Sequence, residues 1–419
     1  MKMCSWVFSA LYTVFVLPIL CHGRKDEPFL KVDFFPVGEG DATVIECPDG
    51  KGGVALSLVD AGSVSLKGTI AEEYFTYIES KLRRSGFYIK NIILTNPEEK
   101  YYNYIEPLVF VRKDSLKSIS FYIAGEREAY SMLDEVFKVN KNVYEFTRNN
   151  EIGGRVSSCG HFGADNETFY DCVKRDINGP IKDSDPIIQL CDDFQITVMA
   201  ANYGYSLRDS QSTDEVARNK SKNVLTLKVT PKGKASPSIL MGDFASDGKS
   251  KTRKHKDYYY SLIKDAHDYY TRSEQFPLSL ANGLASTVVK IPQNGGATDA
   301  TVENEFFRDF VQPTFAVVSA GITSPKGNPK CEVLQAVNNY LSLFSLKKKV
   351  YQCHPVESKF TVDVKILSNG SDNLFQTSTI VINNFPHGKV QYNLITIIMR
   401  KDEILKPKTR VAYEAKGYD

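Results

Sequence analysis

Residues 30–47 read LKVDFFPVGEGDATVIEC, and apolar and polar side chains alternate on both sides of Gly38 and Gly40. An alternation with a period of two residues is typical of β-strands, and glycines between two such runs indicate a tight turn. A second turn, PDG at residues 48–50, leads into another apolar run, VALSLVDAG, at residues 54–62. This part of the chain therefore predicts an N-terminal antiparallel sheet.

Helix and strand patterns follow this sheet. Residues 69–85 carry apolar side chains near helical spacing and end at Gly86, which predicts a helix, and residues 91–95 (NIILT) predict the next strand. Further strands are expected at residues 120–126, 194–201, 223–230, 238–243, 286–292, 314–321, 360–367, 378–385 and 392–399, and further helices at 302–310 and 331–344. Strands followed by helices in both halves of one chain indicate an α/β sandwich with its helices outside.

The N-terminus has the organisation of a secretory signal peptide. Lys2 precedes an uncharged, apolar-rich run at residues 6–20, and Gly23 suits a signal-peptidase site. The run is shorter than the roughly 20 residues that span a bilayer as a helix. We expect residues 1–23 to be removed and the protein to be secreted, with no transmembrane segment in the mature chain. A retained signal anchor is the alternative.

Cysteine usage fits an exported protein. Six cysteines remain after cleavage, and an even number in an exported chain favours disulfides, although about 15 pairings are possible. Pairing of neighbours in the sequence joins Cys159 with Cys172 and Cys331 with Cys353, and leaves Cys47 with Cys191. Three Asn-x-Ser/Thr triplets are candidate glycosylation sites, at Asn166, Asn219 and Asn369.

The charge balance excludes a global field for nucleic acid or an anionic membrane. The chain has 52 Lys and Arg residues against 50 Asp and Glu, a net charge of +2. A local basic run at residues 249–256, followed by three tyrosines, is a candidate site for an anionic polymer, although such a run is more often a solvated loop. We read residues 24–400 as one domain with a polar insertion at about 140–186, and residues 401–419 as a C-terminal tail.

Six short motifs occur in a fixed order between residues 30 and 345. They are Val37-Gly38-Glu39-Gly40-Asp41, Asp60-Ala61-Gly62, Thr95-Asn96-Pro97-Glu98-Glu99-Lys100-Tyr101, Met241-Gly242-Asp243, Lys290-Ile291-Pro292-Gln293-Asn294-Gly295, and Ser319-Ala320-Gly321 followed by Gly327-Asn328-Pro329. In these motifs the chain resembles the metallo-β-lactamase superfamily, and most closely the soluble domain of bacterial DNA-uptake competence proteins. The family motifs read VGQGD, DAG, THxxxDH, TGD, KVPHHG, and SxG followed by GHP. The resemblance implies a four-layer αββα sandwich of the metallo-β-lactamase type.

The same resemblance implies that the family's metal ligands have been replaced. The family holds two zinc ions with imidazoles and carboxylates, which activate a water molecule for hydrolysis. The corresponding positions here are Asn96, Glu98, Lys100, Tyr101, Asp243, Gln293, Asn294 and Asn328. Only Asp243 and Glu98 could still ligate a metal, and the Lys100 ammonium repels a dication. We therefore expect no catalytic residues, no bound metal and no cofactor.

Four charged residues at the altered metal-site motifs are expected to have structural roles. Asp243 and Lys100 are candidates for an internal ion pair that replaces the metal cluster, although each could instead find local hydrogen bonds. Asp41 and Asp60 are expected to have structural roles, with their carboxylates accepting from backbone amides at the glycine turns.

These features favour a secreted, catalytically inactive protein of this fold that acts as an extracellular binding, matrix or secretion component, with a ligand that the sequence does not identify. The alternative is a secreted, phosphoesterase-like hydrolase with an atypical or single-ion site at Glu98 and Asp243. No GxSxG elbow, P-loop or HExxH motif occurs in the chain. A cysteine nucleophile beside His161 or His354 would compete with disulfide formation.

Overall fold

The computed structural model describes residues 28–64, 70–125, 127–140, 142–146, 173–175, 187–201, 225–242, 282–296, 306–319, 329–342, 373–376, 378–381 and 389–415. Several predicted features lie outside these ranges: the signal peptide at 1–23, the basic run at 249–256, and the candidate glycosylation sites Asn166, Asn219 and Asn369. These stay predictions.

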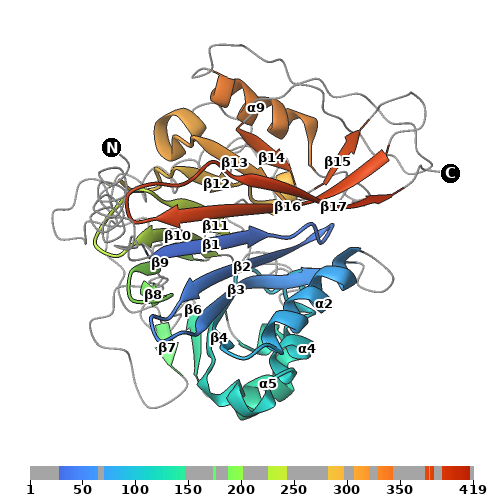
Figure 1. Ribbon diagram of the computed structural model, residues 1–419, viewed down its shortest axis with the longest axis vertical. Helices are drawn as coiled ribbons and strands as arrows, with labels where there is room; N and C mark the ends of the chain where they lie inside the picture. The colour runs from blue at the N-terminus through green and yellow to red at the C-terminus, as the bar shows by residue number, and fades with distance from the viewer. Residues whose placement is uncertain are drawn as a thin grey trace, which may run out of the picture.

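Two β-sheets form the centre of the molecule, and helices lie outside both of them (Figure 1). Sheet A has ten strands in the order β15-β16-β1-β2-β3-β4-β5-β6-β7, with β17 paired to β16 beside this path. Sheet B has seven strands in the order β14-β13-β12-β11-β10-β9-β8. In Figure 1, α2, α4 and α5 lie together on one side of the sheets and α9 lies on the other. The predicted αββα sandwich is confirmed.

The predicted antiparallel sheet at the N-terminus is confirmed, because β2 pairs antiparallel with both β1 and β3. The chain turns between β1 and β2 at Gly38 and Gly40, whose φ angles of 79° and 151° favour glycine. From β3 onwards the strands β3, β4, β5 and β6 run parallel. The strands of sheet A are β1 (Phe29–Phe34), β2 (Gly40–Pro48), β3 (Val54–Ser63), β4 (Phe87–Leu94), β5 (Ser120–Ala124), β6 (Val143–Phe146), β7 (Val173–Arg175), β15 (Ser378–Val381), β16 (Lys389–Arg400) and β17 (Lys408–Ala415).

Sheet B combines antiparallel and parallel pairs. Strand β10 runs antiparallel to β9 and β11, whereas β11, β12, β13 and β14 are parallel neighbours. Its strands are β8 (Ile187–Gln189), β9 (Phe194–Ala201), β10 (Leu225–Pro231), β11 (Ile239–Gly242), β12 (Val288–Lys290), β13 (Phe315–Val318) and β14 (Leu374–Gln376). The short 3-10 turn η6 (Gln293–Gly295) follows β12, and the π-helix η7 (Phe306–Val311) precedes β13.

The helix predicted at residues 69–85 is α2 (Ile70–Leu82), which is amphipathic as its spacing predicts. The other helical segments are α3 (Glu99–Tyr102), α4 (Ile105–Phe110), η1 (Lys113–Ser118), η2 (Arg127–Ala129), η3 (Ser131–Leu133), α5 (Asp134–Val139) and α9 (Cys331–Ser342). Among the helices in the described ranges, none is both long and apolar enough to cross a bilayer.

Among the described residues, apolar side chains form a core on each face of sheet A. The inner core lies between the sheets and joins Phe34 and Ile45 of sheet A to Leu227 and Met241 of sheet B. The outer core lies between sheet A and the helices, where Phe75 of α2 is fully buried among residues of β2, β3 and β4. Burial on both faces explains why β3 and β4 read as nearly continuous apolar runs.

Two segments differ from the sequence predictions. The polar insertion at 140–186 contributes the strands β6 and β7, so sheet A continues into it. The predicted tail at 401–419 is wrong over Lys408–Ala415, because these residues form β17, antiparallel to β16. Charged residues interrupt the alternation in both segments, and pairing with an existing strand compensates for the weak local pattern.

A buried charge network ties α2 to the strands beneath it. Lys81 of α2 contacts the carboxylate of Glu46 on β2, and its Nζ lies 3.9 Å from Oδ2 of Asp33 on β1. Lys31 Nζ lies 3.1 Å from Glu46 Oε1, and Thr396 Oγ1 donates a 2.6 Å hydrogen bond to Asp33 Oδ1. Desolvation raises the pKa of Glu46, but the hydrogen bonds and charges of Lys81 and Lys31 outweigh it, so that its pKa is lowered.

The lowered pKa of Glu46 predicts a contribution to acid stability. A carboxyl with a depressed folded-state pKa stabilises the fold above its ordinary pKa of 4.5, and this stabilisation is lost as pH falls through the folded-state value. We expect Glu46→Gln to make the free energy of unfolding less dependent on pH below 4.5, as measured by urea unfolding at several pH values. Glu135→Gln, which removes an exposed carboxylate paired with Lys138, is the control and should leave the dependence unchanged.

A disulfide joins the two sheets. Cys47, in β2, is bonded to Cys191, in the turn between β8 and β9, with 6.1 Å between their Cα atoms. The sequence predicts this pair as the remaining one, after Cys159 is joined to Cys172 and Cys331 to Cys353. Cys331 begins α9, and Cys159, Cys172 and Cys353 lie outside the described residues. Because 144 residues separate the two bonded cysteines, the bond constrains much of the unfolded chain.

Loss of this bond should therefore cost stability. We expect the double variant Cys47→Ala/Cys191→Ala to lose a few kcal/mol of unfolding free energy, with about 5 kcal/mol as the chain-entropy limit for a loop of this length. Chemical denaturation followed by circular dichroism measures the difference. Peptide mapping of the unreduced protein checks the bond itself, and a free thiol at Cys47 would contradict the pairing.

Candidate functional site

The motif positions come together at one end of the sandwich, where β2 begins and β4, β12 and β13 end. Asn294, just after β12, donates from its side-chain nitrogen to the carbonyl of Gly40 at the start of β2. The same nitrogen donates a 2.8 Å hydrogen bond to the carbonyl of Ser319, directly after β13. Motifs from sheet A and sheet B, more than 250 residues apart, thus meet in one place.

The glycines of the first two motifs allow the α3 loop to lie against the strands. A Cβ atom on Gly40 would lie 2.7 Å from the carbonyl oxygen of Lys100, and one on Gly62 would lie 2.5 Å from the same atom. Real Cβ atoms do not approach a carbonyl so closely. The glycines of the GEGD and DAG motifs are therefore required by the packing of the loop that carries the predicted metal-site positions.

Hydrogen bonds order the beginning of that loop. Asp60 accepts from the Thr95 backbone nitrogen at 2.8 Å and from the Thr95 hydroxyl at 2.5 Å, which is the structural role expected for it. Asn96, at a position where the family has a zinc-binding histidine, accepts a 2.8 Å hydrogen bond from the backbone nitrogen of Glu98. Both acceptors are buried, so the loop is held by its own side chains.

Lys100 has carboxylate partners in this loop and in the turn before β2. Its Nζ lies 3.0 Å from Glu98 Oε2 and 3.6 Å from Glu39 Oε1, and 5.1 Å from the ring centre of Tyr101. The side chains of Lys100 and Glu39 are only 13% and 7% exposed, which strengthens their attraction. Asp243, the partner that the motif order suggests for Lys100, lies outside the described residues.

A second ammonium lies on the other side of Gly40. Lys290, the last residue of β12, forms a direct ion pair with Asp41 Oδ2, and both side chains are more than nine-tenths buried. The second carboxylate oxygen of Asp41 is buried and has no hydrogen-bond partner among the residues that the structure describes. Burial lowers the pKa of Lys290 to about 7, whereas the adjoining carboxylate favours the ammonium, so we regard the pair as ionised. Asp41 therefore has a side-chain ammonium as its partner, not the backbone amide expected for it.

Asn294 has a left-handed backbone conformation, with φ of 54° and ψ of 30°. Asparagine tolerates this conformation better than most residues. Its side chain is buried, and the two hydrogens of its amide nitrogen are used by the carbonyls of Gly40 and Ser319. The Asn294 side chain thus links the two sheets through hydrogen bonds. Gln293 lies beside it in η6.

The described residues do not fit a zinc centre. Zinc needs about four donors, usually imidazole, thiolate or carboxylate. The described residues of this site offer amides that are already hydrogen bonded and carboxylates that are paired with the ammonium groups of Lys100 and Lys290. No group of three or more His, Cys, Asp or Glu side chains that could hold a metal occurs in the described ranges. All six histidines, together with Asp243 and Asn328, lie outside those ranges.

Sequence reasoning missed the role of Glu39. The family motif has glutamine where this chain has Glu39, and aspartate where it has Lys100. The two changes are complementary in charge, and the structure brings the two side chains to 3.6 Å. A comparison of charge changes between the first and third motifs could have identified the pair. The ion pair between Lys290 and Asp41 is not predicted from the sequence either. Lys290 is included there only as part of a motif, and Asp41 is expected to accept hydrogen bonds at a turn.

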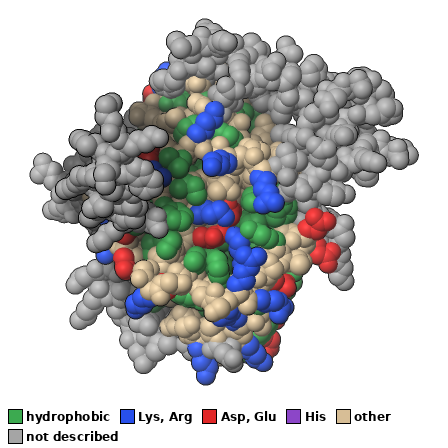
Figure 2. Space-filling view, viewed as in Figure 1, with side chains coloured by type: hydrophobic (Ala, Val, Ile, Leu, Met, Phe, Trp, Pro, Cys, Tyr) green, Lys and Arg blue, Asp and Glu red, His purple; other side chains and the backbone are tan. Residues whose placement is uncertain are grey.

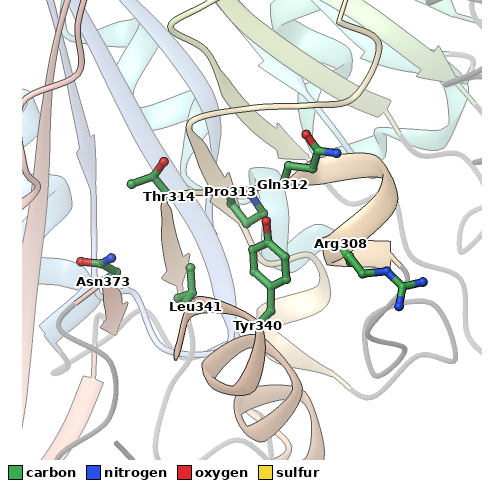
Figure 3. Close-up of a pocket in the computed structure, with 7 residues that line it drawn as sticks. All are labelled: Arg308, Gln312, Pro313, Thr314, Tyr340, Leu341 and Asn373. Carbon is green, nitrogen blue, oxygen red and sulfur yellow. The ribbon is translucent and has the colours of Figure 1, made fainter. Parts of the chain in front are cut away.

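A separate cavity of about 590 Å³ lies at the opposite end of sheet B (Figure 3). It is lined by Gln312, Pro313 and Thr314 before β13, by Tyr340 and Leu341 of α9, and by Arg308 and Asn373. Figure 3 shows the Tyr340 ring between Arg308 on one side and Leu341 on the other. Arg308 is engaged by Asp309 through two hydrogen bonds of 2.7 and 2.9 Å. None of the predicted site residues lines this cavity.

The Lys290–Asp41 pair makes a testable prediction. Lys290→Met leaves the Asp41 carboxylate buried without a counter-charge, and we expect it to lower the unfolding free energy by about 3–5 kcal/mol. Adding Asp41→Asn should restore part of this loss, and Lys290→Arg should retain most of the stability. Urea unfolding followed by circular dichroism measures all three.

Lys228→Met is the matched control for this cycle. Lys228 is also fully buried, but its Nζ donates to the carbonyl of Gly283 at 2.6 Å, and no carboxylate within the described ranges pairs with it. Its replacement should cost less than that of Lys290. Equal losses at the two lysines, with no recovery on adding Asp41→Asn, would show that the ion pair has no special role.

No family model and no curated protein matches the sequence. Among solved structures, the chain is similar to the metallo-β-lactamase fold protein YhfI from Bacillus subtilis, at 10% identity over 82% of this chain and 98% of that one, with a TM-score of 0.35. It is similar to a long form of RNase Z from yeast at 10% identity over 94% of this chain but only 50% of that one, with a TM-score of 0.41. A β-lactamase domain protein from Burkholderia ambifaria is 12% identical over 58% of this chain and 62% of that one, with a TM-score of 0.31. At such identities and TM-scores, these likenesses carry no argument about the site.

Proposed function

We propose that this chain is a secreted, non-catalytic protein of the metallo-β-lactamase type, in which ion pairs and hydrogen bonds have replaced the metal centre. It acts by binding, as an extracellular, matrix or secretion component. The observation that carries this proposal is the presence of two largely buried ammonium groups, Lys100 and Lys290, whose partners Glu39 and Asp41 flank Gly40 in the sequence.

Electrostatics supports an inert cleft. Each lysine is paired with carboxylates that could otherwise have ligated a cation: Glu39 and Glu98 for Lys100, and Asp41 for Lys290. A divalent cation entering this cleft would have to displace an ammonium from its partner and would be repelled by the other. The Asn294 amide is likewise engaged with two carbonyls, so a ligand exchange there would leave buried acceptors unsatisfied.

Export is supported by the sequence of residues 1–23 and by cysteine usage. Disulfides persist in oxidising compartments and are rare in the cytosol. The bond between Cys47 and Cys191 joins the two sheets, so it has a structural position in the fold. A long-lived bond of this kind fits a protein that works outside the cell.

Metal content and hydrolysis test the inert cleft. The mature chain, expressed through a eukaryotic secretory pathway, is incubated with zinc, dialysed and measured by plasma mass spectrometry, and then assayed with bis(p-nitrophenyl) phosphate. We expect substoichiometric zinc and no hydrolysis above the rate with Asp243→Ala, because the described donors are already engaged. Stoichiometric zinc, together with phosphodiester cleavage that is lost in Asp243→Ala, would overturn the proposal in favour of a single-ion or atypical hydrolase.

A further inference from the structure

One face of sheet A is open at the edge formed by β17, β16 and β1. Lys408 and Arg410 of β17 lie opposite Thr396 and Leu394 of β16, and Lys31 of β1 lies opposite Ile398 on the other side of β16. Directly opposed residues of neighbouring strands point to the same face, and residues two apart on one strand also share a face. Lys31, Lys408 and Arg410 therefore project from one surface, which we call the basic strip.

The basic strip lies on the helix side of sheet A, beyond the part that α2 covers. Leu394 belongs to the outer core that contains α2, which fixes the side of the sheet. Burial raises the pKa of Tyr74 of α2, and the charge of Arg410 opposes this effect, so Arg410 lies near α2. Further along β16, Thr396 and Ile398 are only half-buried, and Lys408 and Arg410 are exposed. The open surface thus begins where the cover of α2 ends.

Positive charge exceeds negative charge on this surface. Lys31 is paired with Asp33 and Glu46, and Arg400 with Glu403. Lys408 and Arg410 form no ion pair with any acid in the described part of the chain. Figure 2 shows several Lys and Arg side chains down the middle of the viewed face, with acidic side chains among them, in the region that includes β16 and β1 of Figure 1. These side chains are not covered by other parts of the chain in that view.

We propose that the basic strip binds a sulfated polysaccharide. Lys408 and Arg410 are two residues apart on an extended strand, so they are spaced by about 7 Å. A linear polymer with repeated sulfates can contact both cations along the strand, whereas Lys31 is engaged by Asp33 and Glu46. The positions between the cations are Thr396 and Ile398, which provide aliphatic contact, and Tyr392 lies two residues before Leu394 on β16. Because the proposed export places this surface outside the cell, we assign it to a sulfated glycan, and tighter binding of single-stranded nucleic acid is an outcome of the test.

This inference rests on the proposed export, because sulfated polysaccharides are extracellular, but not on the inertness of the cleft. Basic residues on an edge strand also have another established use, since they prevent strands of different molecules from pairing. The experiment must therefore separate ligand binding from protection of the edge. It must also separate the basic strip from the basic run at residues 249–256.

The test uses the full mature chain and heparin as the probe. Affinity is measured by fluorescence anisotropy with a labelled heparin oligosaccharide at several salt concentrations, for the wild type and for Lys408→Gln/Arg410→Gln. We expect the double variant to bind about tenfold more weakly and the slope of log K against log salt to fall by about 2, one for each lost cation. Lys113→Gln/Lys117→Gln removes two exposed charges from η1 and is the matched control, which should bind like the wild type.

Four results would overturn the inference: no binding of heparin by the wild type, an equal loss of affinity in the control variant, a loss confined to charge reversal of Lys251, Arg253 and Lys254, or tighter binding of single-stranded DNA than of heparin. Unchanged binding with increased aggregation in Lys408→Gln/Arg410→Gln would assign these cations to edge protection. All of these outcomes are independent of the zinc and hydrolysis measurements, so failure of the binding test leaves the proposal of an inert metal site unaffected.

Discussion

The meeting of the two sheets at Gly40 depends on the ion pair between Lys290 and Asp41. Removing these charges from water is costly, and only their direct contact repays the cost. The pair links the last residue of β12 to the second residue of β2, and Asn294 adds hydrogen bonds to Gly40 and Ser319 beside it. In a metal-dependent site, cations from solvent would hold these strand ends together. Here the chain provides the positive charge itself, on a side chain that cannot diffuse away.

This arrangement fixes the loops of the cleft but restricts their chemistry. A ligand that needs Glu98 or Asp41 must compete with an ammonium at contact distance, and one that needs Asn294 must break two hydrogen bonds to carbonyls. These side chains thus contribute to the stability of the sandwich more than to recognition. Recognition is easier to place where side chains are exposed and less constrained, as at Lys408 and Arg410 along the edge of sheet A.

Much of the fold could be predicted from the sequence because its signals are local. The alternation at residues 30–47 predicts strands that the structure contains as β1 and β2, and the helical spacing at residues 69–85 predicts the helix α2. Strand β17 could not be predicted in this way, because Lys408 and Arg410 interrupt its pattern and its pairing with β16 is decided by tertiary contacts. The positions of the candidate site were predictable from motif order. The pairing of Lys100 with Glu39 and of Lys290 with Asp41 was not, because the partners are far apart in the sequence and become neighbours only in the folded sandwich.

The place of β1 in sheet A has a consequence for biosynthesis. This strand lies between β2, which follows it directly, and β16, whose residues are synthesised more than 350 positions later. Contacts of such long sequence separation slow folding and delay it until the whole chain is available. One edge of the N-terminal hairpin therefore stays unpaired while the rest of the polypeptide is synthesised. We expect chaperones to bind this exposed strand edge during translation.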